Sequence, residues 1–323
     1  RRPFFLCVSY AHPHDPFNIT ADYWDRYSPE AIDLPAARPM RRDQMHAFNR
    51  WLQVHHEVDR YPPAEELIRR ARRAYYGMVS YVDDKVGSLM GELRRLGLGD
   101  NTVVVVTSDH GEMLGEHGLW FKRTFYDASV RVPLVWWWPG HWRGGRRVRD
   151  AVSLLDLFPT FLDLVELPDR AAVCREVDGA SLLPLLRGEP SFEQRWAIGE
   201  YYGEGVIHCM RMICRDKWKY VHVQSQPPLL FDREADPLEE TNLAGRPEAA
   251  EFEDWLRGIL LEGWDGEAME ERVLASQRAR LRILEAMGEG RPVSWDHQPR
   301  LDAARRYVRD GDAHQASSDQ RLD

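Results

Sequence analysis

Residues 101–140, with the sequence NTVVVVTSDHGEMLGEHGLWFKRTFYDASVRVPLVWWWPG, set the expectation for the fold. The apolar run from Thr102 to Thr107 has no polar alternation, which is typical of a strand buried on both faces of a parallel sheet. Asp109, His110 and Glu112 come soon after it. Because open α/β sheets bind ligands just beyond the carboxyl ends of their strands, the pattern predicts a functional loop. A simple turn is the alternative, since Asp and Gly are common turn residues.

The N-terminal segment has the same organisation. Pro3 to Tyr10 is predicted to form a second buried strand, and prolines then force residues 11–16 into an irregular loop. His12 and His14 stand on this loop, at a strand end like that of Asp109. No secretory signal is present and the strand starts almost at once, so we expect the biological N-terminus to lie upstream.

Residues 18–63 are mixed in composition and are predicted to form an irregular excursion with a short helix at 43–56. This helix carries three of the chain's histidines. We expect His46, His55 and His56 on the helix surface rather than on a metal, because no carboxylate or cysteine spacing supports a metal there.

Helical periodicity predicts one long amphipathic helix from Pro62 to Leu96. A third strand is predicted at 132–138, and a helix at 153–165 has Ser153 as its N-cap. The resulting order of strand, helix, strand, strand, helix predicts a layered α/β fold.

The pattern changes near residue 186. Short predicted strands at 196–202, 206–215 and 218–223 form an antiparallel meander, and a helix at 247–261 is expected to pack on it. The predicted domains are residues 1–185, the α/β part; residues 186–262, the antiparallel sheet with its helix; and residues 263–323, a C-terminal extension that ends in a polar tail.

Composition excludes several classes of protein. A net charge of −9 argues against a dedicated nucleic-acid surface, which needs a basic excess. The sequence has no apolar run of about 18 residues, so no membrane span is expected. The four cysteines have no zinc spacing and are interpreted as reduced thiols of a cytoplasmic protein.

The central loop contains groups suited to hydrolysis of a sulfate or phosphate ester. That chemistry needs charge neutralisation of the oxyanion and a proton donor to the leaving group. Asp109 offers a metal carboxylate, and His110 offers a second ligand or an oxyanion contact. Lys122 either places a point charge on the anion or is merely solvated. Glu112 and Glu116 are expected at the surface.

Motifs along residues 3–260 occur in an order that resembles the sulfatase family of the alkaline phosphatase superfamily. The resemblance implies an α/β fold with an alkaline-phosphatase-like sheet sandwiched by helices, followed by a smaller antiparallel α+β subdomain. The motifs are Ser108-Asp109-His110-Gly111, Gly115-Glu116-His117-Gly118 with Lys122, Arg131-Val132-Pro133-Leu134, Pro13-His14-Asp15-Pro16, Ser153-Leu154-Leu155-Asp156-Leu157-Phe158-Pro159-Thr160, and Leu230-Phe231-Asp232 with Asp236-Pro237.

The resemblance also implies roles. Asp109 and His110 would be metal ligands, Lys122 would contact the sulfate, and His14, rather than His12, would act at the sulfate or leaving oxygen. One divalent metal is implied. Calcium is expected, and manganese and magnesium stay open, because calcium prefers oxygen ligands whereas imidazole suits manganese.

Within that family, two stretches are similar to the choline sulfatases, which implies choline-O-sulfate as the substrate. Carboxylates and aromatic faces suit a quaternary ammonium group. An ordinary edge strand and a packing tail are the alternatives. The C-terminal tail is also expected to form a homo-oligomer. The residues implied to bind substrate are Glu200, Tyr201, Glu204, Trp295 and Asp296.

One family feature is absent from the sequence. Sulfatases form a formylglycine from a Cys or Ser that has Pro two positions later and then Arg two further on, and no residue here fits that pattern. The formylglycine and the paired N-terminal aspartates of the metal site are therefore expected in a part outside this chain, and the chain alone is predicted to be inactive. A phosphonate or phosphate ester hydrolase and a non-catalytic binding or assembly chain are the alternative functions.

Overall fold

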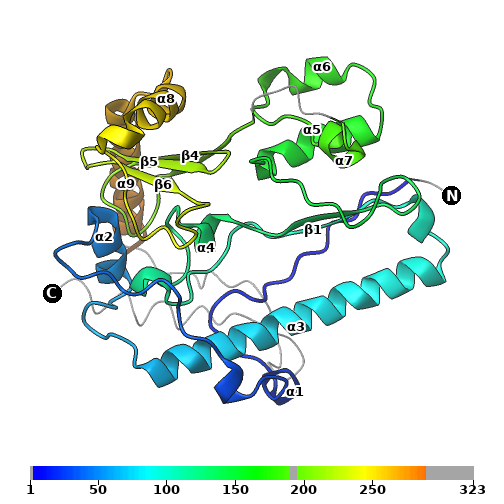
Figure 1. Ribbon diagram of the computed structural model, residues 1–323, viewed down its shortest axis with the longest axis horizontal. Coiled ribbons are helices and arrows are strands. Elements are labelled where there is room, and N and C mark those ends of the chain that lie inside the picture. The colour runs from blue at the N-terminus through cyan, green and yellow to red at the C-terminus, as the bar shows by residue number, and fades with distance from the viewer. Residues whose placement is uncertain (1–2, 190–194, 289–323) are drawn as a thin grey trace. The chain divides into compact units, whose positions relative to one another are not determined.

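A computed structural model describes residues 3–189 and 195–288 (Figure 1). The chain divides into two compact units, residues 1–267 and 268–323, and nearly all described elements belong to the first. Its class is mixed α/β, with helices and antiparallel sheets. None of the helices within the described ranges has the length and apolar composition of a membrane span.

The central strand β1, Val104–Thr107, pairs with β2, Leu134–Trp137, in an antiparallel two-stranded sheet. Val104 lies opposite Trp137, and Thr107 lies opposite Leu134. The prediction of a parallel strand buried on both faces is wrong for the described chain. β1 is only half-buried and Thr107 is exposed, because an apolar run indicates a strand but does not select its partner.

Residues 3–10 also differ from expectation. They form no strand, and their side chains are largely exposed, with Phe5 79% exposed. Backbone donors and acceptors need a partner strand to form a ladder. No described strand pairs with this segment, so apolar composition alone did not produce a strand here.

The long predicted helix is confirmed as α3, Glu65–Arg95. Glu65 and Glu66 occupy its first turn and Arg94 and Arg95 its last, where each charge complements the helix dipole. Figure 1 shows α3 beside α1, Ala21–Trp24. Gly77 makes this approach possible, because a Cβ there would lie 3.2 Å from the Tyr23 carbonyl oxygen.

The antiparallel meander is confirmed for its three predicted strands, and a fourth strand that was not predicted, β6, extends the sheet to the order β3-β4-β5-β6. One face packs on α8, Ala250–Leu261, through Leu256 and Leu260, both fully buried. Tyr220 and Leu230 of the sheet contact this helix side. The strands are β3, Ala197–Tyr201; β4, Met210–Arg215; β5, Trp218–Val223; and β6, Leu229–Asp232.

The opposite face of this sheet supports the central loop. Met113, Leu119 and Phe125 from the loop after β1 join Met210 and Phe231 from the sheet in one buried cluster. Alternation along the strands explains the two faces, since successive side chains point to opposite sides. The sheet thus positions the segment that carries the candidate site.

Shorter helices complete the described chain. Ser153 caps the predicted helix with a capping box, as expected, and the helix begins with a 3-10 turn. The other helical elements are α2, Ala47–His55; α4, Asp127–Val130; α5, Leu157–Leu164; α6, Arg170–Val173; α7, Leu183–Arg187; α9, Gly266–Gly288; and the 3-10 turns Pro29–Ala31, Gly99–Asn101, Glu116–Gly118, Leu154–Asp156, Cys174–Glu176 and Pro247–Ala249.

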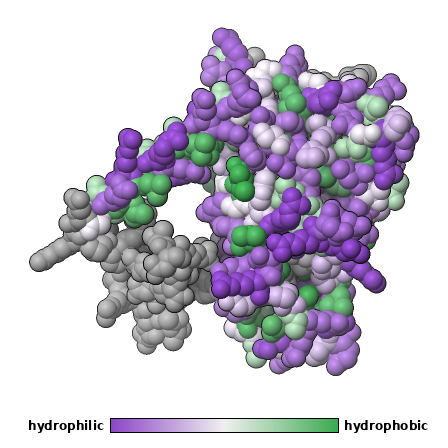
Figure 2. Space-filling model, turned by 90° about the vertical axis from the view of Figure 1, so that its left-hand side faces the viewer, coloured by the Kyte–Doolittle hydropathy of each residue, from purple (hydrophilic) through white to green (hydrophobic). Residues whose placement is uncertain are grey.

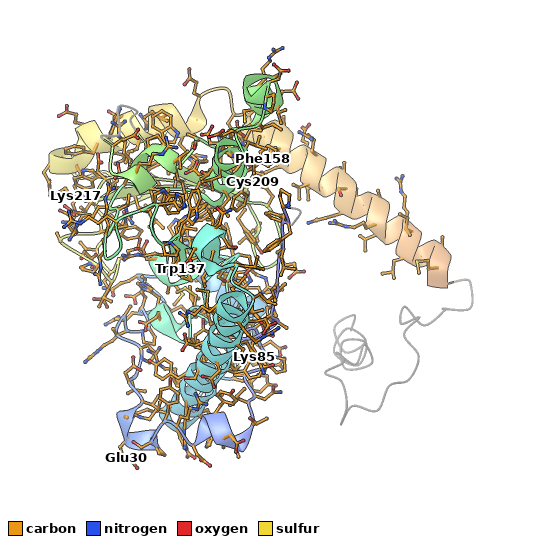
Figure 3. The ribbon with its side chains drawn as sticks, turned by 90° about the vertical axis from the view of Figure 1, so that its right-hand side faces the viewer. Glu30, Lys85, Trp137, Phe158, Cys209 and Lys217 are labelled. Carbon is orange, nitrogen blue, oxygen red and sulfur yellow. The ribbon has the colours of Figure 1, made fainter. Side chains whose placement is uncertain are left out.

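The four cysteines are free thiols, as predicted. Cys209 lies among the packed side chains of the four-stranded sheet (Figure 3) and is 3% exposed. Cys7, by contrast, is exposed. Apolar side chains on α9 lie among polar ones, as Figure 2 shows on the helix that leads into the grey residues. Leu281, Ile283 and Leu284 are 57%, 60% and 65% exposed.

Candidate active site

The Asp109-His110 pair lies in the loop directly after β1. Asp109 Oδ1 accepts hydrogen bonds from the His110 backbone N–H, at 3.0 Å, and from Ser108 Oγ, at 3.3 Å. Burial by itself would raise the pKa of the Asp109 carboxyl, but the neighbouring His110 and these hydrogen bonds lower it below its ordinary value. Asp109 is therefore held as a carboxylate, and its side chain is 84% exposed.

The His110 ring is oriented by the backbone. Its Nδ1 donates to the Gly111 carbonyl oxygen at 2.8 Å, so in the neutral ring Nε2 keeps its lone pair. Nε2 lies 3.6 Å from Asp109 Oδ2. One carboxylate oxygen and one imidazole nitrogen thus lie close together, and a backbone contact fixes the second nitrogen, as is usual for metal-binding histidines.

These two donors fit part of a divalent metal site. Within the described ranges, no group of three or more His, Cys, Asp or Glu side chains is arranged to hold a metal. Asp109 and His110 would supply two ligands, and further ligands would have to come from elsewhere.

The short helix α4 clamps this loop. Gly111 N donates to Ser129 O at 2.6 Å, and Glu112 N donates to Ala128 O at 2.9 Å. A Cβ on residue 111 would lie only 2.1 Å from Ala128 O. Glycine is required here because the two backbones approach so closely. The loop that carries Asp109 and His110 is thereby fixed against α4.

His14 and Lys122 meet although they are far apart in sequence. Lys122 Nζ lies 2.6 Å from His14 Nε2 across a separation of 108 residues. Because an ammonium group can only donate, His14 Nε2 accepts, and Nδ1 donates to Asp15 O at 2.7 Å. The Asp15 carboxylate lies 4.0 Å from Lys122 Nζ. The His14 ring is 6.2 Å from the His110 ring, measured between centroids. All four predicted active-site residues therefore gather in one place.

His12 lies elsewhere on the same loop. Its ring packs edge-on against Tyr81 of α3, with 5.3 Å between centroids, and burial lowers its pKa. This placement is consistent with the preference for His14 over His12.

Glu112 and Glu116 do not lie at the surface, so that prediction is wrong. Burial raises the pKa of Glu112 to about 7, although hydrogen bonds from the Leu114 and Phe121 amides act in the opposite direction. Glu116 accepts from Ala37 N at 2.8 Å and pairs with Arg72 at 3.2 Å. Both carboxylates accept hydrogen bonds from backbone amides in irregular loops. The sequence pattern does not predict where such loops fold back, so it did not predict these contacts.

The loop that carries Lys122 has an unusual backbone. Four of its non-glycine residues are left-handed: Leu114, His117, Phe121 and Arg123, with φ of 45°, 54°, 65° and 80°. Such residues persist only where surrounding contacts determine the conformation. His117, which is buried, stacks on Tyr126 with 4.0 Å between ring centroids.

Arg123 connects this loop to the predicted substrate residues. Its guanidinium pairs with Glu204 and lies 3.0 Å from His56 Nε2. Tyr201 OH donates to the Glu204 carbonyl oxygen at 2.7 Å. Tyr201 and Glu204 therefore lie next to the Lys122 loop.

Glu200 belongs to a different cluster. Arg211 Nε lies 2.8 Å from its carboxylate, and the Arg211 guanidinium lies over the Trp264 ring, 5.3 Å from the centroid. Trp264 Nε1 donates to Tyr202 OH at 3.2 Å. Trp295 and Asp296 lie outside the described residues.

Sequence reasoning missed Arg123 and misplaced the histidines of α2. His46, His55 and His56 are half-buried rather than on the surface, and His46 caps α2 by accepting from Phe48 N. Burial, reinforced by the charges of His55 and Arg123, lowers the pKa of His56 to about 4. The only signal in the sequence for Arg123 was its position directly after Lys122.

Comparison with known proteins places the chain in a class. The family model described as Sulfatase matches residues 1–167, the C-terminal model of N-sulphoglucosamine sulphohydrolase matches residues 115–263, and the model of the choline sulfatase enzyme C terminus matches residues 271–313. The chain therefore belongs to the sulfatase family.

Individual relatives are consistent with this class. The chain is 38% identical to the choline-sulfatase of Rhizobium meliloti (strain 1021) over 96% of its own length and 60% of that protein. It is 34% identical to arylsulfatase K of Gallus gallus over 70% of its own length and 43% of that protein. The chain thus spans less than two thirds of these relatives.

Solved structures agree on the fold. The phosphonate monoester hydrolase from Silicibacter pomeroyi superposes with a TM-score of 0.67 at 30% identity, covering 78% of this chain and 54% of that one. The phosphonate monoester hydrolase of Agrobacterium radiobacter gives 0.66 at 29% identity, covering 84% and 57%.

Proposed function

We propose that this chain is part of a sulfuric ester hydrolase that converts choline-O-sulfate to choline and sulfate. The observation that carries the proposal is the contact of 2.6 Å between Lys122 Nζ and His14 Nε2, beside the Asp109-His110 loop. The contact joins the Lys122 ammonium to the His14 imidazole, a group able to transfer protons. Both lie near Asp109 and His110, the predicted metal ligands. Membership of the sulfatase family and 38% identity to a choline-sulfatase support this substrate.

Each residue has a role in that reaction. Lys122 neutralises negative charge that develops on the sulfate oxygens. His14 assists departure of the choline oxygen, and its Nδ1 contact with Asp15 O orients the ring. Asp109 and His110 would hold a divalent metal, with calcium expected and manganese or magnesium as alternatives, which when bound supplies further charge stabilisation.

The nucleophile is proposed to lie outside this sequence. Sulfatases use a formylglycine, and no residue of this chain has the required Cys or Ser context. The chain alone is therefore expected to be inactive. Catalysis would require the segment or chain that provides the formylglycine.

The choline end would be held by carboxylates and aromatic faces. Glu200 and Glu204 are already paired with Arg211 and Arg123, yet their side chains remain 41% and 72% exposed. That exposure leaves each carboxylate accessible to a quaternary ammonium group, Glu204 beside the Lys122 loop and Glu200 in the separate cluster with Arg211. Tyr201 would supply an aromatic face, and Trp295 and Asp296 are proposed to complete the site.

Two other properties belong to the proposal. A homo-oligomer formed through the C-terminal tail is supported by exposed apolar side chains on α9, such as Leu281 and Leu284. A cytoplasmic location is supported by the four free thiols.

A phosphonate or phosphate ester hydrolase is the second candidate, favoured by the similarity to the two phosphonate monoester hydrolase structures. The deciding experiment compares turnover of choline-O-sulfate with that of an aryl phosphonate by the protein combined with its formylglycine-containing part. Higher kcat/KM for the sulfate ester supports the proposal. Preference for the phosphonate would overturn it, and turnover of neither would favour a non-catalytic binding or assembly chain.

A further inference from the structure

Lys122 lies in a loop with an unusual backbone conformation. Phe121 and Arg123 flank Lys122, and both are left-handed non-glycine residues, with φ of 65° and 80°. Left-handed residues of this kind relax to ordinary backbone unless other contacts prevent it. In this conformation Lys122 Nζ lies 2.6 Å from His14 Nε2.

One side chain joins the two ends of that loop. Glu112 Oε1 accepts from Phe121 N at 2.5 Å and from Leu114 N at 3.2 Å. Its two donors are themselves left-handed residues, at φ of 65° and 45°. A backbone hydrogen bond from Met113 N to Phe121 O, at 2.8 Å, runs alongside. The carboxylate thus bonds the amide that immediately precedes Lys122.

Glu112 is itself anchored on the side away from the loop. Its backbone N–H donates to Ala128 O, and Gly111 N donates to Ser129 O, so α4 fixes the backbone from which the side chain extends. A carboxylate on a fixed backbone can determine where its hydrogen-bond donors lie. Glu112 therefore links the Asp109-His110 segment to the Lys122 segment.

We infer that Glu112 is a positioning residue, whose side-chain oxygen holds the 114–123 loop so that the Lys122 ammonium meets His14. Its relevance to catalysis rests on the proposed function, in which Lys122 and His14 act on the sulfate ester. The contact itself can be measured without substrate or metal.

The test records ¹⁵N signals of the His14 ring in the full chain. In the wild type, His14 Nε2 accepts from Lys122 and Nδ1 carries the proton, which gives a defined tautomer signature. Lys122→Met is the reference in which the Nε2 hydrogen bond is lost. Glu112→Ala should reproduce this loss, whereas Glu112→Gln, which keeps an acceptor oxygen at the same reach, should retain the wild-type signature.

Two further variants keep the inference falsifiable. Glu112→Asp retains a carboxylate but shortens the side chain, so it should also lose the signature. It therefore supplies the test if Glu112→Ala does not fold. Glu116→Gln is the matched control, because Glu116 bonds Ala37 and Arg72 instead, and it should leave the signature unchanged.

A wild-type signature in Glu112→Asp, or in Glu112→Ala that folds, would overturn the inference. Equal loss of the signature in Glu116→Gln would also overturn it, because any change in the loop would then disturb the Lys122–His14 contact. Failure of the proposed function appears differently, as undiminished turnover by Lys122→Met in the catalytically competent assembly.

Discussion

Lys122 Nζ lies 2.6 Å from His14 Nε2, and this single contact joins the N-terminal loop to the loop after β1. The Lys122 ammonium donates to this ring nitrogen, because an ammonium group has no acceptor atom. An oriented His14 ring beside a positive charge suits an anionic ester whose leaving oxygen must be assisted.

Loss of the Lys122 charge should reduce turnover strongly. Lys122→Met in the catalytically competent assembly is expected to lower kcat by about 10²- to 10³-fold, as loss of one transition-state contact typically does. Steady-state kinetics with choline-O-sulfate measure the effect. Lys217→Met is the control, since Lys217 pairs with Asp232 in the four-stranded sheet. Equal effects of both variants would contradict the assigned role.

Metal binding should depend on Asp109, and the effect of changing His110 should show which ion the site prefers. Asp109→Asn is expected to weaken metal affinity by at least about tenfold. Even residues that only hydrogen-bond to a metal ligand change the affinity by about 10–100-fold when they are mutated. His110→Asn should preserve calcium binding but weaken manganese binding, because the amide offers oxygen in place of nitrogen.

Shifts in melting temperature with added calcium or manganese, reversed by a chelator, measure this. Asp100→Asn, at an exposed position in the turn before β1, is the matched control. An unchanged metal-induced shift in Asp109→Asn would exclude Asp109 as a ligand.

Acid should destabilise the fold through His56. Its pKa is about 4 in the folded chain, whereas an unperturbed histidine has a pKa of 6.5, so between these values the unfolded state binds more protons. The contribution of His56 is therefore fully present above pH 6.5 and is lost as the pH falls toward 4. We expect a loss on the order of 1–2 kcal/mol, allowing for partial solvent screening.

Urea unfolding at a series of pH values, compared with His56→Gln, gives the measurement. The Gln variant should show a shallower slope across that window, because it cannot take up the proton. Parallel stability curves for the two proteins would refute the assignment.

The buried Lys219 should be essential for stability. Its ammonium, fully buried, pairs with Asp127 and with Glu239, at 2.6 Å to the latter, and donates to Phe125 O at 2.9 Å. Lys219→Met is expected to cost about 3–5 kcal/mol, because the buried Glu239 carboxylate and the part-buried Asp127 carboxylate both lose this ammonium.

The part-buried ion pair of Lys217 with Asp232 is the comparison. Lys217→Met should cost about 1 kcal/mol, because Asp232 keeps its hydrogen bonds from the backbone amides of Glu234 and Ala235. Free energies of unfolding in urea decide between the two positions. A similar small loss for both would mean that the buried pair does not anchor α4 to the sheet.

Oligomer formation should respond to the apolar side chains of α9. Leu281→Glu combined with Leu284→Glu is expected to convert the predicted homo-oligomer to a monomer, since both side chains are exposed in the single chain. Light scattering on the wild type and the double variant measures the mass. Val165→Glu, an exposed apolar position outside α9, is the control. A monomeric wild type would contradict the predicted oligomer.

Local patterns were sufficient for part of this protein. The periodicity of α3, the short strands of the meander and the N-cap Ser153 each depend on neighbours a few residues away, and the structure confirms all three. The adjacent pair Asp109-His110 at the end of a strand was recognisable for the same reason. The roles of the site residues remain predictions.

Long-range contacts decided the rest. β1 pairs antiparallel with β2, and residues 3–10 form no strand, because strand pairing depends on partners that an apolar run cannot specify. Glu112 faces inward because backbone amides of a folded-back loop required an acceptor.

The sequence by itself determined the family, the long helix α3, the short strands of the meander and the identity of the reactive groups, since these reside in composition and short spacing. Only the tertiary structure decided that His14 meets Lys122 across 108 residues and that Arg123 ties Glu204 to His56. The physical reason is that such contacts arise from packing the loop after β1 against the four-stranded sheet, which no local pattern encodes.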